Sequence, residues 1–529
     1  MVKRFVLFLL LGILAFPAFS DTSSERDTLT VSYARTDYQW DPVHSYTSIE
    51  AQLYTAIYEG LVTYHPFSLK PVPGVARFWE VMPDRKTYRF YLREDARYWN
   101  GDPVKADHFR DAWFVLLDPD EKAEYSSLFD IVKGAYEYRS GETEDKESVG
   151  IRVLSDNLIE IELNEPADHF LKILCHHSFA PIHPKFLKQR RWSQKTAVLS
   201  NGPFYVLSYS ADEILLAKNR LYWGEASVDL ENIRIVFTDD PRETATRFNN
   251  REIDWCGGGI DWGAIEEPGA LVLNPMFATS YLFFSCAPPF DNADVRRGLA
   301  LLIPWQDIRS EEYMLIPSSG LVPSIPGYPE TGGIEEQNIK EGLALLEASG
   351  FRKGNGLPEL LLRVPEGSDI ERIAALIRDA WSEHLECPVV IETHGYPNYF
   401  DILKNRSYTL GSITWIGDFA DPLTFLQMWT TSSNLNDSGY GNENYDTLIR
   451  ESMSQTGEKR YETLGIAEEL LLSEAAVLPL SHYPALNAVD LSRIDGWFPN
   501  PLDIHPFKYM SFIEPEIPPS VVMAGNSFD

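Results

Sequence analysis

The sequence contains few cysteines and no paired-cysteine motif. None of the four forms a Cys-x-x-Cys pair, which excludes the common structural zinc sites and thioredoxin-type redox sites. The four lie far apart, at Cys175, Cys256, Cys286 and Cys387. A disulfide can form in an oxidising compartment. The spacing does not select a pair, however, so free thiols are an equal alternative.

The motifs of common enzyme classes are also missing. The sequence has no Gly-x-Ser-x-Gly, His-Glu-x-x-His or Gly-x-x-x-x-Gly-Lys-[Ser/Thr] segment, so nothing indicates an esterase, a zinc protease or a nucleotide hydrolase. Paired acidic residues are too frequent in this acidic chain to mark a glycosidase. His176, His177 and His183 could bind a metal, but loop histidines more often pack or face solvent. We predict no enzyme activity, no metal and no cofactor.

Basic residues are scarce. The chain has 46 Lys and Arg against 78 Asp and Glu, for a formal net charge of −32. No run of Lys and Arg is longer than two residues. A strongly negative field disfavours nucleic acid and anionic membrane surfaces as partners, and its simplest role is solubility.

Long apolar runs are absent except near the amino terminus. Lys3 and Arg4 precede an apolar stretch, 5–15, and the segment Ala18-Phe19-Ser20, with a small residue at each end, precedes a polar segment. This layout predicts a cleavable secretory signal over residues 1–20, because the run is too short to span a bilayer. A retained membrane anchor is the alternative. No cysteine follows the run, so we expect no lipid anchor and a mature protein that is soluble in the periplasm.

What is present is a long chain with mixed α and β patterning. Its 529 residues, 44% of them hydrophobic, exceed the size of a single core and predict two or three lobes. Apolar spacing predicts helices and strands in alternation. The clearest are a helix at 48–58, a strand at 87–92, a helix at 108–117 capped by Asp107, a hairpin at 204–218, a short apolar strand at 280–285 and a β-α-β unit at 360–393.

Seven groups of residues follow one another in an order typical of one protein family. The most specific is Phe90-x-Leu92-Arg93-x-Asp95-Ala96-x-x-Trp99-x-x-x-Pro103-Val104-x-Ala106-x-x-Phe109. The others are Glu59-Gly60-Leu61, Pro73-Gly74-Val75-Ala76, Asn201-Gly202-Pro203-Phe204, Lys218-Asn219-x-x-Tyr222-Trp223, Pro288-Pro289-Phe290-Asp291-Asn292-x-x-Val295-Arg296 and Trp415-x-Gly417-Asp418-x-x-Asp421-Pro422-x-x-Phe425-Leu426. Together they resemble the family-5 extracellular solute-binding proteins of ABC importers, the oligopeptide and dipeptide receptors.

The resemblance implies a periplasmic-binding-protein-like α/β fold of type II, cluster C, with two lobes and a hinged cleft. A discontinuous domain I (21–58, 187–277 and 487–529) would carry an inserted domain II (59–186). Domain III (278–486) would lie across the hinge. The ligand would be enclosed when the lobes close. We expect a monomer that delivers its ligand to the permease subunits of an importer.

The resemblance also implies the site residues. Asp418 would pair with the α-ammonium of a peptide, because an enclosed charge needs an opposite partner. Exposed backbone at the cleft edge would pair with the peptide, and aromatic rings would form pocket walls. The candidates are Trp415, Gly417, Phe419, Tyr396, Tyr125, Gly257, Gly258 and Tyr46. Each has an ordinary alternative as a core, turn or cap residue, and Asp421 is expected to brace the helix that follows it.

Two departures from the family pattern leave the ligand open. Tyr46 stands where the family has an acid, and Ser412 stands where the oligopeptide receptor has an arginine for the carboxyl ends of longer ligands. Ligand length and side-chain preference therefore do not follow from the sequence. Short peptides are the expected ligands. The alternatives are a non-peptide solute such as a metal chelate, haem or sugar, and a structural or chaperone-like protein without a defined ligand.

Overall fold

The computed structural model describes residues 27–513, apart from 37, 46, 188–197, 311–315 and 396–397. The predicted secretory signal and the site candidates Tyr46 and Tyr396 lie outside the described residues. In the described part, no helix has both the length and the apolar character needed to cross a bilayer. The four cysteines are all described, and all carry free thiols.

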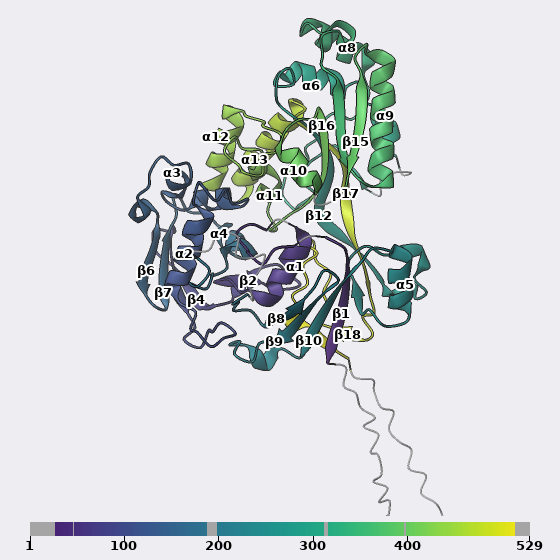
Figure 1. Cartoon of the computed structure of the whole chain (residues 1–529). Helices are drawn as coiled ribbons and strands as arrows, with labels where there is room; N and C mark the ends of the chain where they lie inside the picture. Colours follow the sequence, from purple (N-terminus) through teal and green to yellow (C-terminus); the bar gives the residue numbers. More distant parts are fainter. Residues whose placement is uncertain are drawn as a thin grey trace, which may run out of the picture.

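One large sheet extends through both lobes (Figure 1). It has 11 strands, ten of them in the order β15-β14-β16-β12-β17-β11-β1-β10-β9-β8, with β13 (Ile316–Pro317) paired to β17. The strands are β15 (Val389–His394), β14 (Leu360–Pro365), β16 (Leu410–Ile416), β12 (Leu271–Phe284), β17 (Val477–Val489), β11 (Trp255–Cys256), β1 (Thr28–Ala34), β10 (Asn232–Thr238), β9 (Glu213–Lys218) and β8 (Phe204–Tyr209). This mixed α/β architecture agrees with the predicted fold class.

Two strands connect the lobes. β12 and β17 are long antiparallel neighbours that run from the lower to the upper lobe in Figure 1. Their pairing is interrupted between Pro275 and Thr279, where a bulge bends the ladder. The predicted domain boundaries at 277/278 and 486/487 both fall inside these strands. The sequence pattern predicted only the short apolar strand at 280–285, because the polar and proline residues before it hide the rest of β12.

A second sheet lies in the other part of the lower lobe. Its four strands have the order β4 (Ala76–Val81), β5 (Thr87–Leu92), β7 (Leu158–Glu162) and β6 (Ile151–Ser155). Alternate residues of β5 are buried, which places Phe90 in the core. Helix α2 (Ala106–Leu116) packs its apolar face, including Phe109 and Trp113, against this sheet. Helix α2 begins one residue before Asp107, so the predicted cap is wrong. Asp107 instead lies in the first turn, where a negative charge interacts favourably with the helix dipole.

The upper lobe contains most of the remaining helices (Figure 1). They are α6 (Ala293–Ala300), α8 (Ile339–Ala348), α9 (Ser368–His384), α10 (Asn398–Lys404), α11 (Leu423–Leu426), α12 (Glu443–Met453) and α13 (Gly457–Ser473). The predicted β-α-β unit is confirmed, since β14 precedes α9 in the sequence, β15 follows it, and the two strands pair in parallel. A core cluster around Trp305 and Trp381 fills this lobe.

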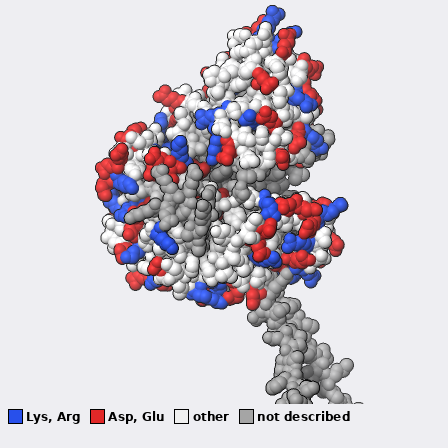
Figure 2. Space-filling view, in the orientation of Figure 1, with Lys and Arg blue, Asp and Glu red and all other residues white. Residues whose placement is uncertain are grey.

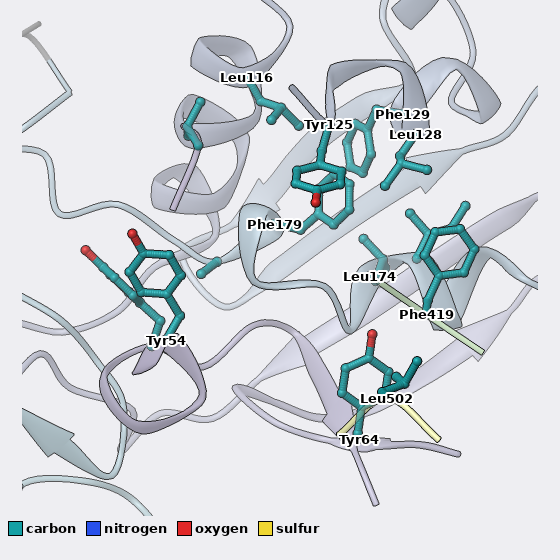
Figure 3. Packing of buried hydrophobic residues seen from close by; sticks show 14 of the residues in the cluster. Tyr54, Tyr64, Leu116, Tyr125, Leu128, Phe129, Leu174, Phe179, Phe419 and Leu502 are labelled. Carbon is teal, nitrogen blue, oxygen red and sulfur yellow. The ribbon is translucent and has the colours of Figure 1, made fainter. Parts of the chain in front are cut away.

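The lower lobe and the region between the lobes share a larger apolar core (Figure 3). Near this core lies α1 (Ser48–Ile57), which begins at the cap residue Thr47. The Thr47 side chain accepts a hydrogen bond from the Glu50 backbone, and the Glu50 carboxylate accepts one from the Thr47 backbone. This reciprocal cap fixes the start of α1, which forms one wall of the cleft described below.

Candidate solute-binding cleft

A cleft lies between the predicted domains, with about 1720 Å³ of empty space, part of it open to solvent. Its walls come from parts of the sequence that are far apart. On the lower side they include α1, β2 (Val62–Tyr64) and the segments 124–125 and 175–177. On the upper side they include α10, the end of β16 with the residues after it, and loop residues from 428 to 437. The site is therefore complete only when both lobes come together.

Asp418 reaches the cleft because of its place after β16. Gly417, which follows the strand, is closely packed, and a Cβ atom there would lie 2.5 Å from a ring carbon of Phe277. A larger residue would push the chain off this path. Thr424 then holds the next turn, since its hydroxyl accepts a hydrogen bond from the Asp418 backbone and donates one to the Asp418 carboxylate. The Asp418 side chain lines the cleft.

The Asp418 carboxylate is nearly enclosed, with 12% of its side chain exposed. Tyr125 donates a hydrogen bond to Oδ1 at 2.8 Å, and Thr424 donates one to Oδ2 at 3.1 Å. Burial raises the pKa of Asp418 to about 6, although these hydrogen bonds partly offset the effect. At neutral pH the side chain is therefore a carboxylate that lacks full charge compensation.

The one basic side chain within 4 Å of this carboxylate, among the described residues, is His176, whose Nε2 lies 3.8 Å from Oδ1. Burial lowers the pKa of His176 to about 3, so its ring is neutral at pH 7. The ring of His177 lies 4.0 Å away, centroid to centroid, and its Nε2 forms a hydrogen bond with Ser45. Neither histidine supplies a positive charge. No group of three or more potential metal ligands occurs in the described part of the chain.

Tyrosines from the lower lobe complete the surroundings of Asp418. Tyr125 is 1% exposed and bonds the carboxylate, whereas Tyr64 donates to the Asp418 backbone oxygen at 2.9 Å. Figure 3 shows both tyrosines in the apolar core, which fixes their rings. The hydrogen bonds to Asp418 therefore join the two lobes at the same residue that we expected to bind the ligand.

Asp421 has a different environment from Asp418. Its carboxylate forms a bidentate pair with Arg460 at 2.8 and 2.7 Å and accepts a hydrogen bond from the Leu423 backbone. Burial alone would raise the pKa of Asp421, but the Arg460 guanidinium holds it below its ordinary value. Asp421 braces α11 against α13, as expected from the sequence.

The other predicted site residues divide into two groups. Trp415 and Gly417 line the cleft together with Asp418 and Tyr125. Phe419 is fully buried in the apolar core (Figure 3). Gly257 and Gly258 follow β11 and are not among the residues that line the cleft. A Cβ atom on Gly257 would lie 2.8 Å from the ring of Tyr33, so close packing accounts for this glycine.

Several cleft residues were not singled out from the sequence. Tyr64 and Thr424 bond Asp418, and Glu124, Lys404 and Asp437 line the cleft farther along. Thr424 lies inside the segment that carries the family resemblance, so its spacing from Asp418 was an available signal. The others lie on separate loops and helices, and only the folded chain brings them to one surface.

The model of the middle region of a family described as bacterial extracellular solute-binding proteins, family 5, matches residues 70–437. The chain belongs to this family. The match covers most of the chain, including the Asp418 segment, nearly all of predicted domain II and about three quarters of predicted domain III.

Two curated family-5 proteins illustrate the relationship. The oligopeptide-binding protein OppA of Bacillus subtilis is 26% identical over 483 residues, which are 87% of this chain and 88% of that protein. The dipeptide-binding protein DppE of the same organism is 26% identical over 479 residues, with the same coverage. Both relationships extend over nearly the whole length of each protein.

Solved structures show the same fold. The murein tripeptide binding protein MppA of Escherichia coli superposes with a TM-score of 0.83 at 21% identity, over 93% of this chain and 99% of that one. A second structure of MppA, described as the unliganded open form, gives 0.62 at 21% identity over 92% and 98% of the two chains.

Proposed function

We propose that this family-5 protein is the exported receptor of an ABC importer and that it captures short peptides by their free amino end. The peptide lies in the cleft between the lobes, with its α-ammonium against Asp418. The closed protein then delivers the peptide to the permease. The protein performs no chemistry on its ligand.

The observation that carries this proposal is the enclosure of the Asp418 carboxylate among neutral hydrogen-bond donors. A nearly enclosed carboxylate costs free energy unless a cation compensates it. The side chains around it donate hydrogen bonds but carry no full positive charge. A ligand ammonium fits this place because it supplies both the charge and further donors. Trp415 and Tyr64 line the adjacent walls, as befits a ligand whose remaining surface is partly apolar.

The predicted domain division belongs to the same proposal. In this arrangement domain I holds the ends of the chain, domain II is inserted into it, and β12 and β17 form the hinge to domain III. The bulge between Pro275 and Thr279 supports a hinge there, because a break in the hydrogen-bond ladder makes bending easier. A cleaved signal, a periplasmic location and a monomeric state complete the proposal.

Calorimetry with a matched pair of peptides tests the role of Asp418. Trialanine and N-acetyl-trialanine differ in the ammonium alone, so the wild-type protein should bind trialanine more tightly. Asp418→Asn should weaken trialanine binding by about 2–5 kcal/mol and remove the difference between the two peptides. Equal binding of both peptides by the wild type, or binding of neither, would exclude this function.

The matched control is Asp379→Asn, since the Asp379 side chain on α9 is 67% exposed. This variant should retain the affinity for trialanine and the discrimination against its acetylated form. Thermal unfolding of all three proteins, followed by circular dichroism, separates a binding defect from a folding defect. Mass spectrometry of ligands that co-purify with the wild type provides an independent check on the ligand class.

A further inference from the structure

A second group of carboxylates lines the cleft beyond Asp418. Among the described residues that line it, the charged ones are Glu59, Glu124, Lys404, Asp418 and Asp437. Glu59 is compensated within the protein, since its carboxylate lies 3.0 Å from Lys508 and accepts hydrogen bonds from Tyr222 and Trp223. Glu124 and Asp437 are different. They come from opposite lobes, and among the described residues neither carboxylate accepts a hydrogen bond from a basic side chain, although Lys404 and His44 lie within 4 Å of Glu124.

Glu124 is held in a nearly enclosed position, with 14% of its side chain exposed. Its Oε2 atom is buried and has no hydrogen-bond partner among the described residues. The two nearest basic atoms are farther than a hydrogen bond, with His44 Nδ1 at 3.8 Å from Oε2 and Lys404 Nζ at 3.7 Å from Oε1. The carboxylate thus has acceptor capacity left for a cation in the cleft.

Asn434 fixes Glu124 opposite Asp437. From the upper lobe, its side-chain amide donates to the Ala123 carbonyl at 3.0 Å and contacts the Ser126 hydroxyl at 3.2 Å. These two contacts flank Glu124 on either side, so closure of the lobes sets its position. Asp437 lies three residues after Asn434 on the same loop. The two carboxylates are close enough for the charge of Glu124 to raise the pKa of Asp437.

The Asp437 carboxylate also lacks a hydrogen-bond donor within the described part of the chain, although its backbone oxygen accepts one from Tyr408 at 2.9 Å. Burial is the main cause of its raised pKa of about 6, and the charges of Lys404 and Arg406 reduce the shift. A partly buried carboxylate without donors gains more from a ligand cation than a fully exposed one does.

The walls of this part of the cleft are apolar. Phe400, Met428 and Leu435 also line the cleft, with Leu435 two residues before Asp437 and Phe400 one helical turn before Lys404. An apolar wall that ends at negative charges matches a long aliphatic chain that ends in a cation. Lysine and arginine side chains combine an aliphatic chain with a terminal cation. Aliphatic side chains lack the cation, and acidic side chains carry the opposite charge.

We propose that Glu124 and Asp437 form a subsite for a lysine or arginine side chain of the bound peptide. This inference rests on the proposed function and adds a substrate class, peptides that carry a basic residue. The presence of Lys404 allows a competing assignment. In that assignment Lys404 binds a carboxylate of the ligand, and Glu124 serves only to hold the Lys404 side chain in place. The experiment therefore includes acidic peptides.

The test uses tetra-alanine and derivatives in which each position in turn is lysine, norleucine or glutamate. Lysine and norleucine share the aliphatic chain but differ in the terminal charge. At one position, the wild-type protein should bind the lysine peptide at least about 10-fold more tightly than the norleucine peptide. Asp437→Asn and Glu124→Gln should each reduce this ratio, and the double variant should bring it to about 1.

Two controls separate this inference from the proposed function. N-acetylation of tetra-alanine should still weaken binding to Asp437→Asn, because Asp418 is intact, and Asp379→Asn should behave as wild type. If tetra-alanine binds but lysine and norleucine are equivalent at every position, the subsite is excluded while the receptor function stands. A preference for glutamate that survives both substitutions would assign this region to Lys404. Failure of all the peptides to bind would overturn both proposals.

Discussion

Asp418 and Asp421 lie three residues apart, but their carboxylates have opposite environments. Asp418 is buried beside neutral donors, and Asp421 is buried against the Arg460 guanidinium. The same substitution should therefore change stability in opposite directions. At pH 7, Asp418→Asn should raise the free energy of unfolding of the ligand-free protein by about 2 kcal/mol, because it removes a buried charge.

Asp421→Asn should instead lower the free energy of unfolding by about 3–5 kcal/mol, since it leaves Arg460 buried without a partner. Urea unfolding of the wild type and the two variants measures both effects. Changes of the same sign would show that the difference between the two carboxylates has been misassigned. The two substitutions thus distinguish an aspartate that serves ligand binding from one that stabilises the fold.

The raised pKa of Asp418, about 6, predicts how peptide binding depends on pH. A carboxylate pairs with an ammonium, whereas a carboxylic acid does not. Affinity for trialanine should therefore be highest near pH 7 and fall by about 10-fold per pH unit below pH 6, while deprotonation of the peptide's own ammonium, with an ordinary pKa of about 8, lowers it again at higher pH. Calorimetry between pH 5 and 8 measures this, and Asp418→Asn should lose this dependence.

In the ligand-free protein, the contribution of Asp418 to folding stability depends on pH in the opposite direction to its contribution to peptide binding. The folded pKa of Asp418 exceeds its ordinary value of 3.8, so the folded chain binds the proton more tightly than the unfolded chain does. The resulting stabilisation is fully present below about pH 4 and is lost as the pH rises through about 6. Comparison of wild type with Asp418→Asn by thermal unfolding isolates this contribution, since other groups titrate in both proteins.

At the scale of elements, local patterns predicted more than long-range ones. The β14-α9-β15 unit and the β8-β9 hairpin were found as expected, because each is specified by periodicity and turns within a short segment. The extent of β12 was missed, since its first half has an irregular pattern that is stabilised by pairing with β17, about 200 residues away. Asp418, Trp415, Gly417 and Tyr125 were available from the family resemblance.

Gly417 connects the end of strand β16 to Asp418 in the cleft. A methyl group at this position would overlap Phe277 and Thr424, and Thr424 bonds the Asp418 carboxylate. Gly417→Ala should reduce stability by about 1–3 kcal/mol. It should also weaken trialanine binding beyond this loss, because Asp418 is displaced. Calorimetry at a temperature where the variant remains folded, together with urea unfolding, measures both; unchanged binding would contradict the assigned path of the chain.

At the scale of the molecule, hydrogen bonds join predicted domains II and III beside the cleft. Besides the bonds to Asp418, Ser127 donates to Gln427 at 2.9 Å, Arg139 donates to the Ser432 carbonyl at 3.0 Å, and Lys172 donates to the Ala420 carbonyl at 3.0 Å. These contacts hold the two predicted domains against each other, in addition to the apolar packing between them.

Peptide binding should therefore make the protein more compact in solution. Small-angle X-ray scattering should show a smaller radius of gyration when saturating trialanine is added to the wild type. Asp418→Asn at the same peptide concentration should show little change, and Asp379→Asn should respond as the wild type does. An unchanged radius in the wild type would contradict ligand-driven closure.

The distribution of charged side chains over the surface is also a property of the whole molecule. On the face in Figure 2, the described basic side chains are scattered among acidic ones instead of forming one broad patch. Binding of nucleic acid requires many basic groups on one surface. This face therefore gives no support to such a partner, in keeping with the net charge of −32.

The pairing of β12 with β17 has a consequence for the order in which the protein is made. β11 and β12 both use β17 as a neighbour, and β17 is formed by residues 477–489. A nascent chain that has not reached this segment leaves both strands with an open edge. Contacts so distant in sequence also form slowly. The lower lobe is thus completed only after β17 has been made, about 200 residues after β12, and for the exported receptor proposed above this delay leaves time to thread the chain through a secretion channel before it folds.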